Sequence, residues 1–143
     1  MEIDPRGPRF GAALTVVVLA IVLITQSAWL LTAQFLVFAL GAVAGLRYAP
    51  YGLVYRRLVR PRLGPPDNTE AEAPPRFAQA VGAVMALAGV LGFAAGSAVA
   101  GTVFTALALA AAFLNAAFDF CLGCQVYLFI QRTRPSMHRA AGS

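Results

Sequence analysis

The stretch at residues 10–46, FGAALTVVVLAIVLITQSAWLLTAQFLVFALGAVAGL, decides the fold, because its 37 residues carry no charged side chain. A single helix of that length would measure about 55 Å at about 1.5 Å per residue, whereas the hydrocarbon core of a bilayer is about 30 Å thick. The stretch is therefore too long for a single straight crossing of the bilayer. The polar residues Thr25-Gln26-Ser27 divide the stretch, so we expect a hairpin of two helices.

A second uncharged stretch, residues 77–118, has the same form. It contains 42 residues, and its polar interruption is Gly96-Ser97. The sequence therefore predicts an all-α, integral membrane fold. We expect four helices, near residues 10–25, 29–47, 77–94 and 99–121.

The composition of the 143-residue chain supports this class. Hydrophobic residues make up 59% of the chain, charged residues make up 12%, and the mean hydropathy is +0.73. Soluble domains carry about 25% charged residues, and a chain of this size cannot hide so much apolar surface in one small core. These values exclude an ordinary soluble domain, a disordered segment and a disulfide-rich secreted module.

The charged residues fall into three groups: before residue 10, between residues 47 and 76, and after residue 118. Two hairpins return the chain to its starting side, so the three groups share one face, which holds all eleven arginines. Because arginine is enriched on the cytoplasmic side, we predict a four-span protein of the plasma membrane with both termini in the cytoplasm. The alternative is a signal peptide cleaved near Ser27-Ala28.

The two hairpins have the form of a parallel repeat. Pro8-Arg9-Phe10 opens the first and Pro75-Arg76-Phe77 opens the second, and a short basic segment follows each. The identities in these segments are Val54/Val126, Tyr55/Tyr127, Arg60/Arg132 and Arg62/Arg134. We expect one membrane domain, residues 1–143, with halves at about 8–62 and 75–134. An exposed, Pro-rich linker at residues 64–75 joins them.

The basic segment of the first half has the spacing of a helix that lies in the lipid headgroup layer. Its apolar residues at the i, i+3, i+4, i+7 positions of one face are Tyr51, Val54, Tyr55 and Leu58. The opposite face carries Arg56, Arg57 and Arg60. These arginines suit anionic lipid or a partner protein, and simple anchoring of the chain is the alternative.

The chain has two cysteines, in the motif Cys121-Leu122-Gly123-Cys124. Cysteines three residues apart lie close enough to form a disulfide, and such a motif in a reducing compartment is typical of redox or metal chemistry. We expect Gly123 to end the fourth helix and Cys124 to begin the next, whose N-terminus favours a thiolate. Two alternatives stay open: a pair of small residues buried at a helix end, and a metal site. A closed zinc site wants four ligands, so we expect no metal and no cofactor.

Two polar residues lie one turn apart near the end of the fourth expected helix, Asn115 and Asp119. An acidic residue beside a membrane span is usually paired or functional. The repeat aligns Asp119 with Arg47, and we expect these two side chains to pair between the halves. The alternative role for Asp119 is that of a proton acceptor for the neighbouring thiols.

Four segments together resemble a known family: IDPRGPRF at residues 3–10, YGLVYRRLVRPR at 51–62, PPRFAQ at 74–79 and CLGC at 121–124. The chain is similar over nearly its whole length to the small actinobacterial integral membrane proteins of domain-of-unknown-function family 4395. Members are often encoded beside rhodanese-like sulfurtransferases and thioredoxin-like proteins. The resemblance thus implies a link to cytoplasmic sulfur or thiol metabolism by association, without a mechanism.

Three functions follow as hypotheses. The first is a thiol-redox or sulfur-relay component in which Cys121 and Cys124 react with a thioredoxin-like or rhodanese-like partner. The second is a non-catalytic membrane anchor that recruits a soluble enzyme through its arginines. The third is a small transporter of a sulfur anion, which needs a homo-oligomer because four spans rarely enclose a pathway. Nothing in the sequence has the pattern of a nucleic-acid-binding module, and the basic charge follows from membrane topology.

Overall fold

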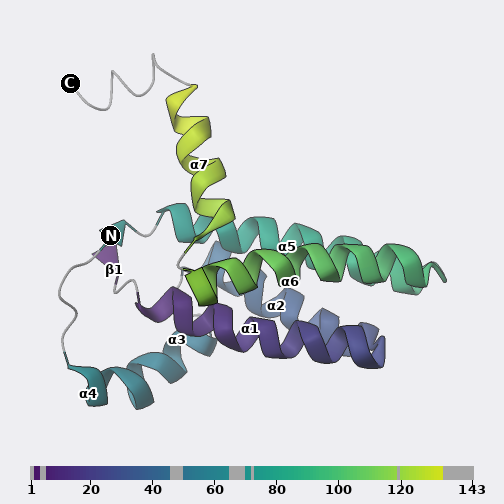
Figure 1. Ribbon diagram of the computed structural model, residues 1–143, viewed down its shortest axis with the longest axis horizontal. Helices are drawn as coiled ribbons and strands as arrows, with labels where there is room; N and C mark the ends of the chain where they lie inside the picture. Colours follow the sequence, from purple (N-terminus) through teal and green to yellow (C-terminus); the bar gives the residue numbers. More distant parts are fainter. Residues whose placement is uncertain are drawn as a thin grey trace.

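A computed structural model describes residues 2–3, 6–45, 50–64, 70–71, 73–118 and 120–133 (Figure 1). In chain order the elements are β1 Glu2–Ile3, α1 Arg6–Thr25, α2 Ala28–Val43, α3 Pro50–Val54, the π-helical turn η2 Tyr55–Val59, α4 Arg60–Leu63, β2 Glu70–Ala71, α5 Ala73–Ala94, α6 Ala98–Phe118 and α7 Leu122–Arg132. Since the strands in the described ranges have two residues each, the prediction of an all-α fold is confirmed.

Both hairpins turn where the sequence predicts. Each turn contains one residue with a positive φ, 56° at Gln26 and 86° at Gly96. The side chains of Ser27 and Ser97 then accept hydrogen bonds from the backbone N–H three residues later, at 3.2 and 3.1 Å. A serine in this position satisfies an N–H group that the first turn of a helix leaves unpaired. Each turn is therefore followed at once by a new helix.

Three helices, α1, α5 and α6, are long and apolar enough to cross a membrane, and they indicate a membrane protein. α2 is also apolar, but its 16 residues span about 24 Å, which is less than the hydrocarbon thickness of about 30 Å. The expected helix at residues 29–47 was too long, because α2 ends at Val43. Gly45, with a φ of 108°, has the left-handed conformation that commonly follows a helix.

The four longest helices, α1, α2, α5 and α6, run along the longest axis of the molecule (Figure 1). α6 packs against both α1 and α5, and α5 packs against α2. The buried cluster between them consists of Leu19, Val22, Leu31, Phe38, Ala86 and Ala108. Every long helix contributes to this cluster, so the two hairpins share one core.

Small residues on α5 let α2 approach closely. A Cβ at Gly82 would lie 2.9 Å from ring atoms of Phe38, and a Cβ at Gly89 would lie 2.8 Å from Leu31. The large side chains of α2 therefore fill the notches that the glycines leave. In lipid, where apolar side chains gain little by leaving the solvent, such close contact is a main source of helix association.

The outer surface of the bundle is apolar. The most exposed large apolar side chains are Trp29 (87%), Ile24 (82%), Val43 (81%) and Val99 (75%). Soluble monomers rarely expose continuous apolar surface on this scale. A lipid environment explains it.

The shorter elements gather at the end of the bundle where α1 begins. α7 leaves this end at a steep angle to α5 and α6, and α3, η2 and α4 leave it on another side (Figure 1). β1 pairs antiparallel with β2, opposing Glu2 to Ala71 and Ile3 to Glu70. The expected linker at residues 64–75 is thus not irregular throughout: it contains β2, and α5 already begins at Ala73.

We predict that Gly92→Ala destabilises the α5–α6 hairpin by about 1–3 kcal/mol, the usual cost of overpacking. A Cβ at this position would lie 2.8 Å from the backbone nitrogen of Gly101, which cannot yield as a flexible side chain can. Thermal unfolding in detergent micelles measures the effect. Gly11→Ala is the matched control, because its Cβ would meet Tyr51 at an ordinary 3.6 Å. Equal melting temperatures for both variants would contradict the close crossing.

Candidate functional site

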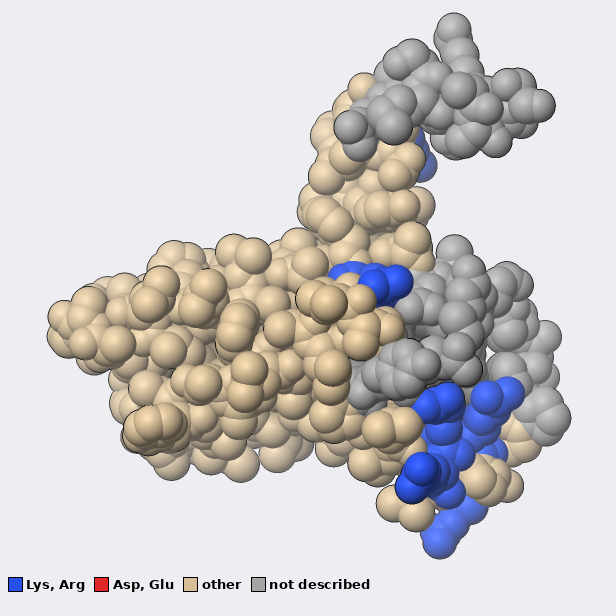
Figure 2. Space-filling model, turned by 180° about the vertical axis from the view of Figure 1, so that it is seen from behind, with Lys and Arg blue, Asp and Glu red and all other residues tan. Residues whose placement is uncertain are grey.

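Arginines gather at one end of the molecule. Figure 2 shows the blue surface over that end, while the long body of the bundle is tan. The arginines of the short basic segment are Arg56 and Arg57 on η2 and Arg60 and Arg62 on α4. All four long helices begin or end here, so the features described below lie near one another at this end.

The cysteine pair lies at the start of α7. Cys121 and Cys124 form a disulfide with a Cα–Cα distance of 5.1 Å. Cys121 is the N-cap of α7, with φ −90° and ψ 104°, and its sulfur accepts a hydrogen bond from the Cys124 N–H at 3.1 Å. Both side chains are partly exposed. The sulfurs therefore lie at the positive end of a helix dipole and within reach of solvent.

The expected role of Gly123 was wrong. α6 ends at Phe118, where the Phe120 N–H bonds back to the Leu114 carbonyl at 3.1 Å, and α7 begins at Leu122. Gly123 is thus the second residue of α7 and does not end the preceding helix. A Cβ on Gly123 would lie 2.6 Å from the Cα of Ala78. The glycine is required because the backbone of α7 crosses that of α5 at this point.

An aromatic pair continues the contact between α7 and α5. The rings of Phe77 and Tyr127 lie 5.7 Å apart at 47°. The rings of Phe10 and Tyr55, at the corresponding positions of the first half, lie 5.8 Å apart at 45°. Such tilted pairs add about 0.5–1.5 kcal/mol beyond the burial of their area. The two ring pairs stabilise the packing of α7 against α5 and of η2 against α1.

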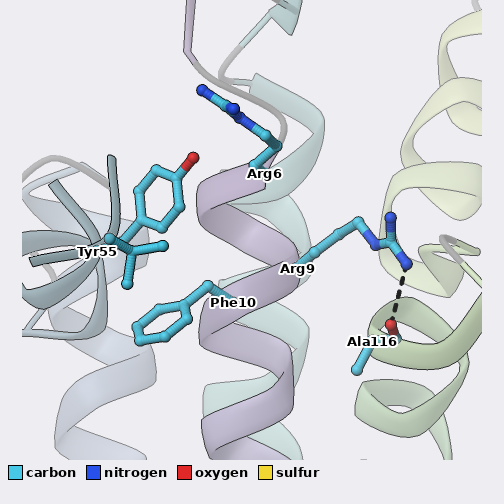
Figure 3. Close-up of a pocket in the computed structure, with 6 residues that line it drawn as sticks. Arg6, Arg9, Phe10, Tyr55 and Ala116 are labelled. Atoms are coloured by element: carbon cyan, nitrogen blue, oxygen red, sulfur yellow. Dashed lines mark hydrogen bonds between the residues drawn. The ribbon is translucent and has the colours of Figure 1, made fainter. Parts of the chain in front are cut away.

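Arg9 and Arg76 each bind the C-terminus of a helix in the other hairpin. The Nη2 of Arg9 donates to the Ala116 carbonyl of α6 at 3.2 Å (Figure 3). Arg76 donates through Nε and Nη2 to the Ala42 carbonyl of α2, at 3.2 and 2.8 Å, and through Nη2 to the Val43 carbonyl at 2.8 Å. The last carbonyls of a helix lack intrahelical donors and attract positive charge. Sequence reasoning marked these arginines only as signs of the repeat and missed this role.

The residues expected to form one apolar face of the first basic segment do not share one environment in the structure. Tyr55 is 2% exposed against the bundle, whereas Leu58 is 64% exposed. Residues 55–59 form a π-helical turn, which places one more residue in each turn than an α-helix does. The 3.6-residue periodicity used for the prediction therefore fails here. Arg56 and Arg57 are exposed, and Arg60 is half-buried.

A buried polar contact lies on the other side of this segment. The Tyr51 hydroxyl donates to Oε1 of Gln34 at 2.7 Å, and Gln34 is 1% exposed. Burial raises the pKa of Tyr51 and so further favours the protonated phenol, which is the form that donates this bond. The Nε2 of Gln34 has no acceptor among the described residues. Sequence analysis gave no sign of this pair.

The remaining predicted site residues lie apart from these contacts or cannot be placed. Asn115 lies in the last turns of α6 and is partly exposed. Asp119 and Arg47 fall outside the described residues, so their pairing stays a prediction. Within the described ranges no three His, Cys, Asp or Glu side chains group as metal ligands do.

We predict that Gly123→Ala raises amide hydrogen exchange in α7 about tenfold or more. The added Cβ must push α7 away from the backbone of α5, and overpacking costs about 1–3 kcal/mol, where about 1.4 kcal/mol is tenfold in the opening equilibrium. Exchange measured by mass spectrometry on the oxidised protein reads this out. Gly11→Ala serves again as the control and leaves α7 unchanged. Unaltered protection of α7 in Gly123→Ala would refute the crossing.

The chain matches a known family model. The model of a family described as a domain of unknown function, DUF4395, matches residues 3–132. No curated protein and no solved structure matches the chain. The actinobacterial origin that the resemblance implies stays a prediction.

Proposed function

This chain belongs to the DUF4395 family, and we propose that it is a membrane-bound thiol-redox component. Its Cys121–Cys124 pair would exchange disulfides with a soluble thioredoxin-like protein. The observation that carries the proposal is the disulfide across the first turn of α7, the helix that leaves the apolar bundle. Both cysteines are partly exposed, as a pair that reacts with another protein must be. Disulfides in reducing compartments are usually transient and catalytic.

The geometry favours Cys121 as the attacking thiol. In the reduced protein a thiolate at this N-cap is stabilised by the helix dipole and by the Cys124 N–H. The sequence alone leaves the order of attack open, and it placed Cys124 where the structure has Cys121, at the start of the helix.

The exchange has two steps. The Cys121 thiolate attacks one sulfur of the partner's disulfide, which forms a mixed disulfide and releases the partner's other sulfur as a thiolate. The Cys124 thiolate then attacks the Cys121 sulfur, which forms the intramolecular disulfide and releases the partner's second thiolate. Two electrons pass from the pair to the partner, and the protons of the two thiols go to the partner's thiolates. The reverse sequence oxidises the partner.

We predict that Cys124→Ser accumulates a mixed disulfide, at least tenfold more than Cys121→Ser does. Without Cys124 nothing resolves the bond that Cys121 forms, whereas Cys121→Ser lacks the attacking thiol. Reduced membrane vesicles are mixed with an oxidised thioredoxin-like protein, and the adduct is measured on a non-reducing gel and identified by mass spectrometry.

The double Cys121→Ser, Cys124→Ser variant is the control and gives no adduct. Two results would sink the proposal: thiols that never oxidise in the membrane, or single variants that trap nothing. A persulfide on Cys121 after exposure to a rhodanese-like sulfurtransferase would instead support the sulfur-relay form of the same site.

The topology that this chemistry needs is four crossings with both termini in the cytoplasm. Two observations support it: the arginines of α4 and η2 lie at the same end as the start of α7, and the turns at the opposite end carry no charge. α2 is short for a span, but it packs against α5 inside the bundle and does not have to match the bilayer alone.

Single cysteines test the topology in the variant that lacks Cys121 and Cys124. We predict that a membrane-impermeant maleimide labels Ser97→Cys on intact cells, because the turn at Ser97 faces outward. Arg62→Cys at the other end of the molecule is labelled only after the membrane is opened. The reverse pattern would place the cysteine pair outside the cell and remove its access to cytoplasmic partners.

The parallel repeat is also a proposal, and three pairs of contacts support it. The ring pairs Phe10–Tyr55 and Phe77–Tyr127, the arginine bonds of Arg9 and Arg76, and the serine caps of α2 and α6 recur at matching positions. Such recurrence is what a duplicated helical hairpin produces. It accounts for the occurrence of a short helix after each half.

A non-catalytic anchor is the second candidate, because Arg56 and Arg57 are exposed on a segment that leaves the bundle. For an anchor we predict that changing Arg56, Arg57 and Arg60 to Gln abolishes recruitment of the soluble partner to vesicles, while the double cysteine variant recruits it normally. Co-sedimentation with the partner found by trapping measures this. Recruitment lost only in the cysteine variant would reject the anchor.

A further inference from the structure

The 11 residues of α7, LGCQVYLFIQR, form an amphipathic helix. Leu122, Val126 and Phe129 follow the i, i+4, i+7 spacing of one helix face and are 40%, 48% and 64% exposed. We call these three residues the apolar face of α7. Cys124 is two residues from both Leu122 and Val126, which places it about 160° around the helix from them. The helix has no acidic residue, and its one charge is that of Arg132 in the last turn.

α7 meets α5 at a level inside the apolar part of that helix. A Cβ on Gly123 would lie 2.6 Å from the Cα of Ala78, so the two backbones are in contact there. Ala78 belongs to the uncharged stretch 77–118 and lies about 7–8 Å from the start of α5. It follows Arg76, whose guanidinium binds the last carbonyls of α2. The crossing is therefore on the hydrocarbon side of the last charged residue before this span.

α7 stays near this level as it leaves the bundle. Four residues after Gly123, Tyr127 packs on Phe77, the neighbour of Ala78 in α5. α7 thus advances about 6 Å along its own axis while its contact moves by one residue of α5. Figure 1 shows the same arrangement, since α7 stands at a steep angle to α5 and α6. A helix that leaves a membrane-spanning bundle in this way runs along the membrane surface.

We propose that the apolar face of α7 binds the lipid bilayer itself, at the boundary between headgroups and acyl chains. Amphipathic helices in this position bury their apolar face about 5–10 Å into that boundary. Three residues separate the end of α6 at Phe118 from the start of α7 at Leu122, and Phe118 is 67% exposed. The exposed surface of the span thus continues into the apolar face of α7, and the lipid around the first reaches the second.

The level of the crossing also favours lipid over a protein as the occupant. A soluble partner would have to enter the headgroup layer to cover the apolar face, whereas acyl chains already surround the bundle at the level of Ala78. The opposite side of α7, which carries Cys124 and Gln131, is left to water. Lipid contact therefore holds the cysteine pair at the level of the headgroups whatever chemistry the pair performs, and the proposal does not rest on the redox function.

Tryptophan fluorescence in liposomes tests the proposal on a chain that keeps its disulfide. The sequence has one tryptophan, Trp29, so Trp29→Phe gives a spectroscopically silent background. In that background Phe129→Trp reports on the apolar face, and Gln131→Trp, about 160° around the helix, is the matched control. Lipids brominated at acyl carbons near the headgroup should quench Phe129→Trp at least about threefold more than Gln131→Trp, since the apolar face lies among those carbons. Aqueous acrylamide should quench the two variants in the reverse order.

Leu122→Trp, in the first turn of α7, repeats the measurement if the change at Phe129 lowers the melting temperature. Equal quenching of the apolar face and the control by acrylamide would overturn the proposal, because α7 would then stand clear of the bilayer. An apolar face that neither quencher reaches would overturn it as well. That result would show that a protein partner or a second copy of this chain covers the face instead of lipid.

Discussion

A guanidinium group in the hydrocarbon layer of a bilayer is costly, and so is an unpaired backbone N–H or C=O group. The architecture depends on these two costs. Helices satisfy the backbone, and every described arginine lies at one end of the bundle or on the elements that leave it. That end is consequently where polar chemistry is available. The disulfide and the arginine bonds to helix ends both lie there.

The packing of the helices determines where the short elements point. Small residues let α2 reach α5, and Gly123 lets α7 cross α5 beside Ala78. Arg9 and Arg76 then bind the last carbonyls of α6 and α2. Because each arginine belongs to one hairpin and its acceptor to the other, these bonds join the two halves at the end that carries the cysteines. The cysteine pair therefore lies at the start of a helix that packs against α5.

Reasoning from the sequence identified the helices, the two turns and the cysteine motif. It failed at three positions for a common reason. It extended α2 beyond Val43, made Gly123 the end of a helix, and gave residues 51–58 one apolar face. In each case the local sequence pattern is compatible with several helix ends or with several sets of residues on one helix face. The choice among them depends on contacts with another helix, such as the crossing of Gly123 with Ala78 and the burial of Tyr55 against the start of α1.

The sequence by itself indicated that this protein lies in a membrane, because the length of an uncharged stretch and the positions of the arginines are properties of the chain alone. It also indicated that the two cysteines can form a disulfide, since they are only three residues apart in the chain. Only the tertiary structure decided that Cys121, and not Cys124, caps α7, and that Arg9 and Arg76 bind the ends of helices in the other hairpin. Those outcomes depend on how closely separate helices approach each other. The approach is set by the volumes of side chains on both facing helices, which come from different segments of the chain.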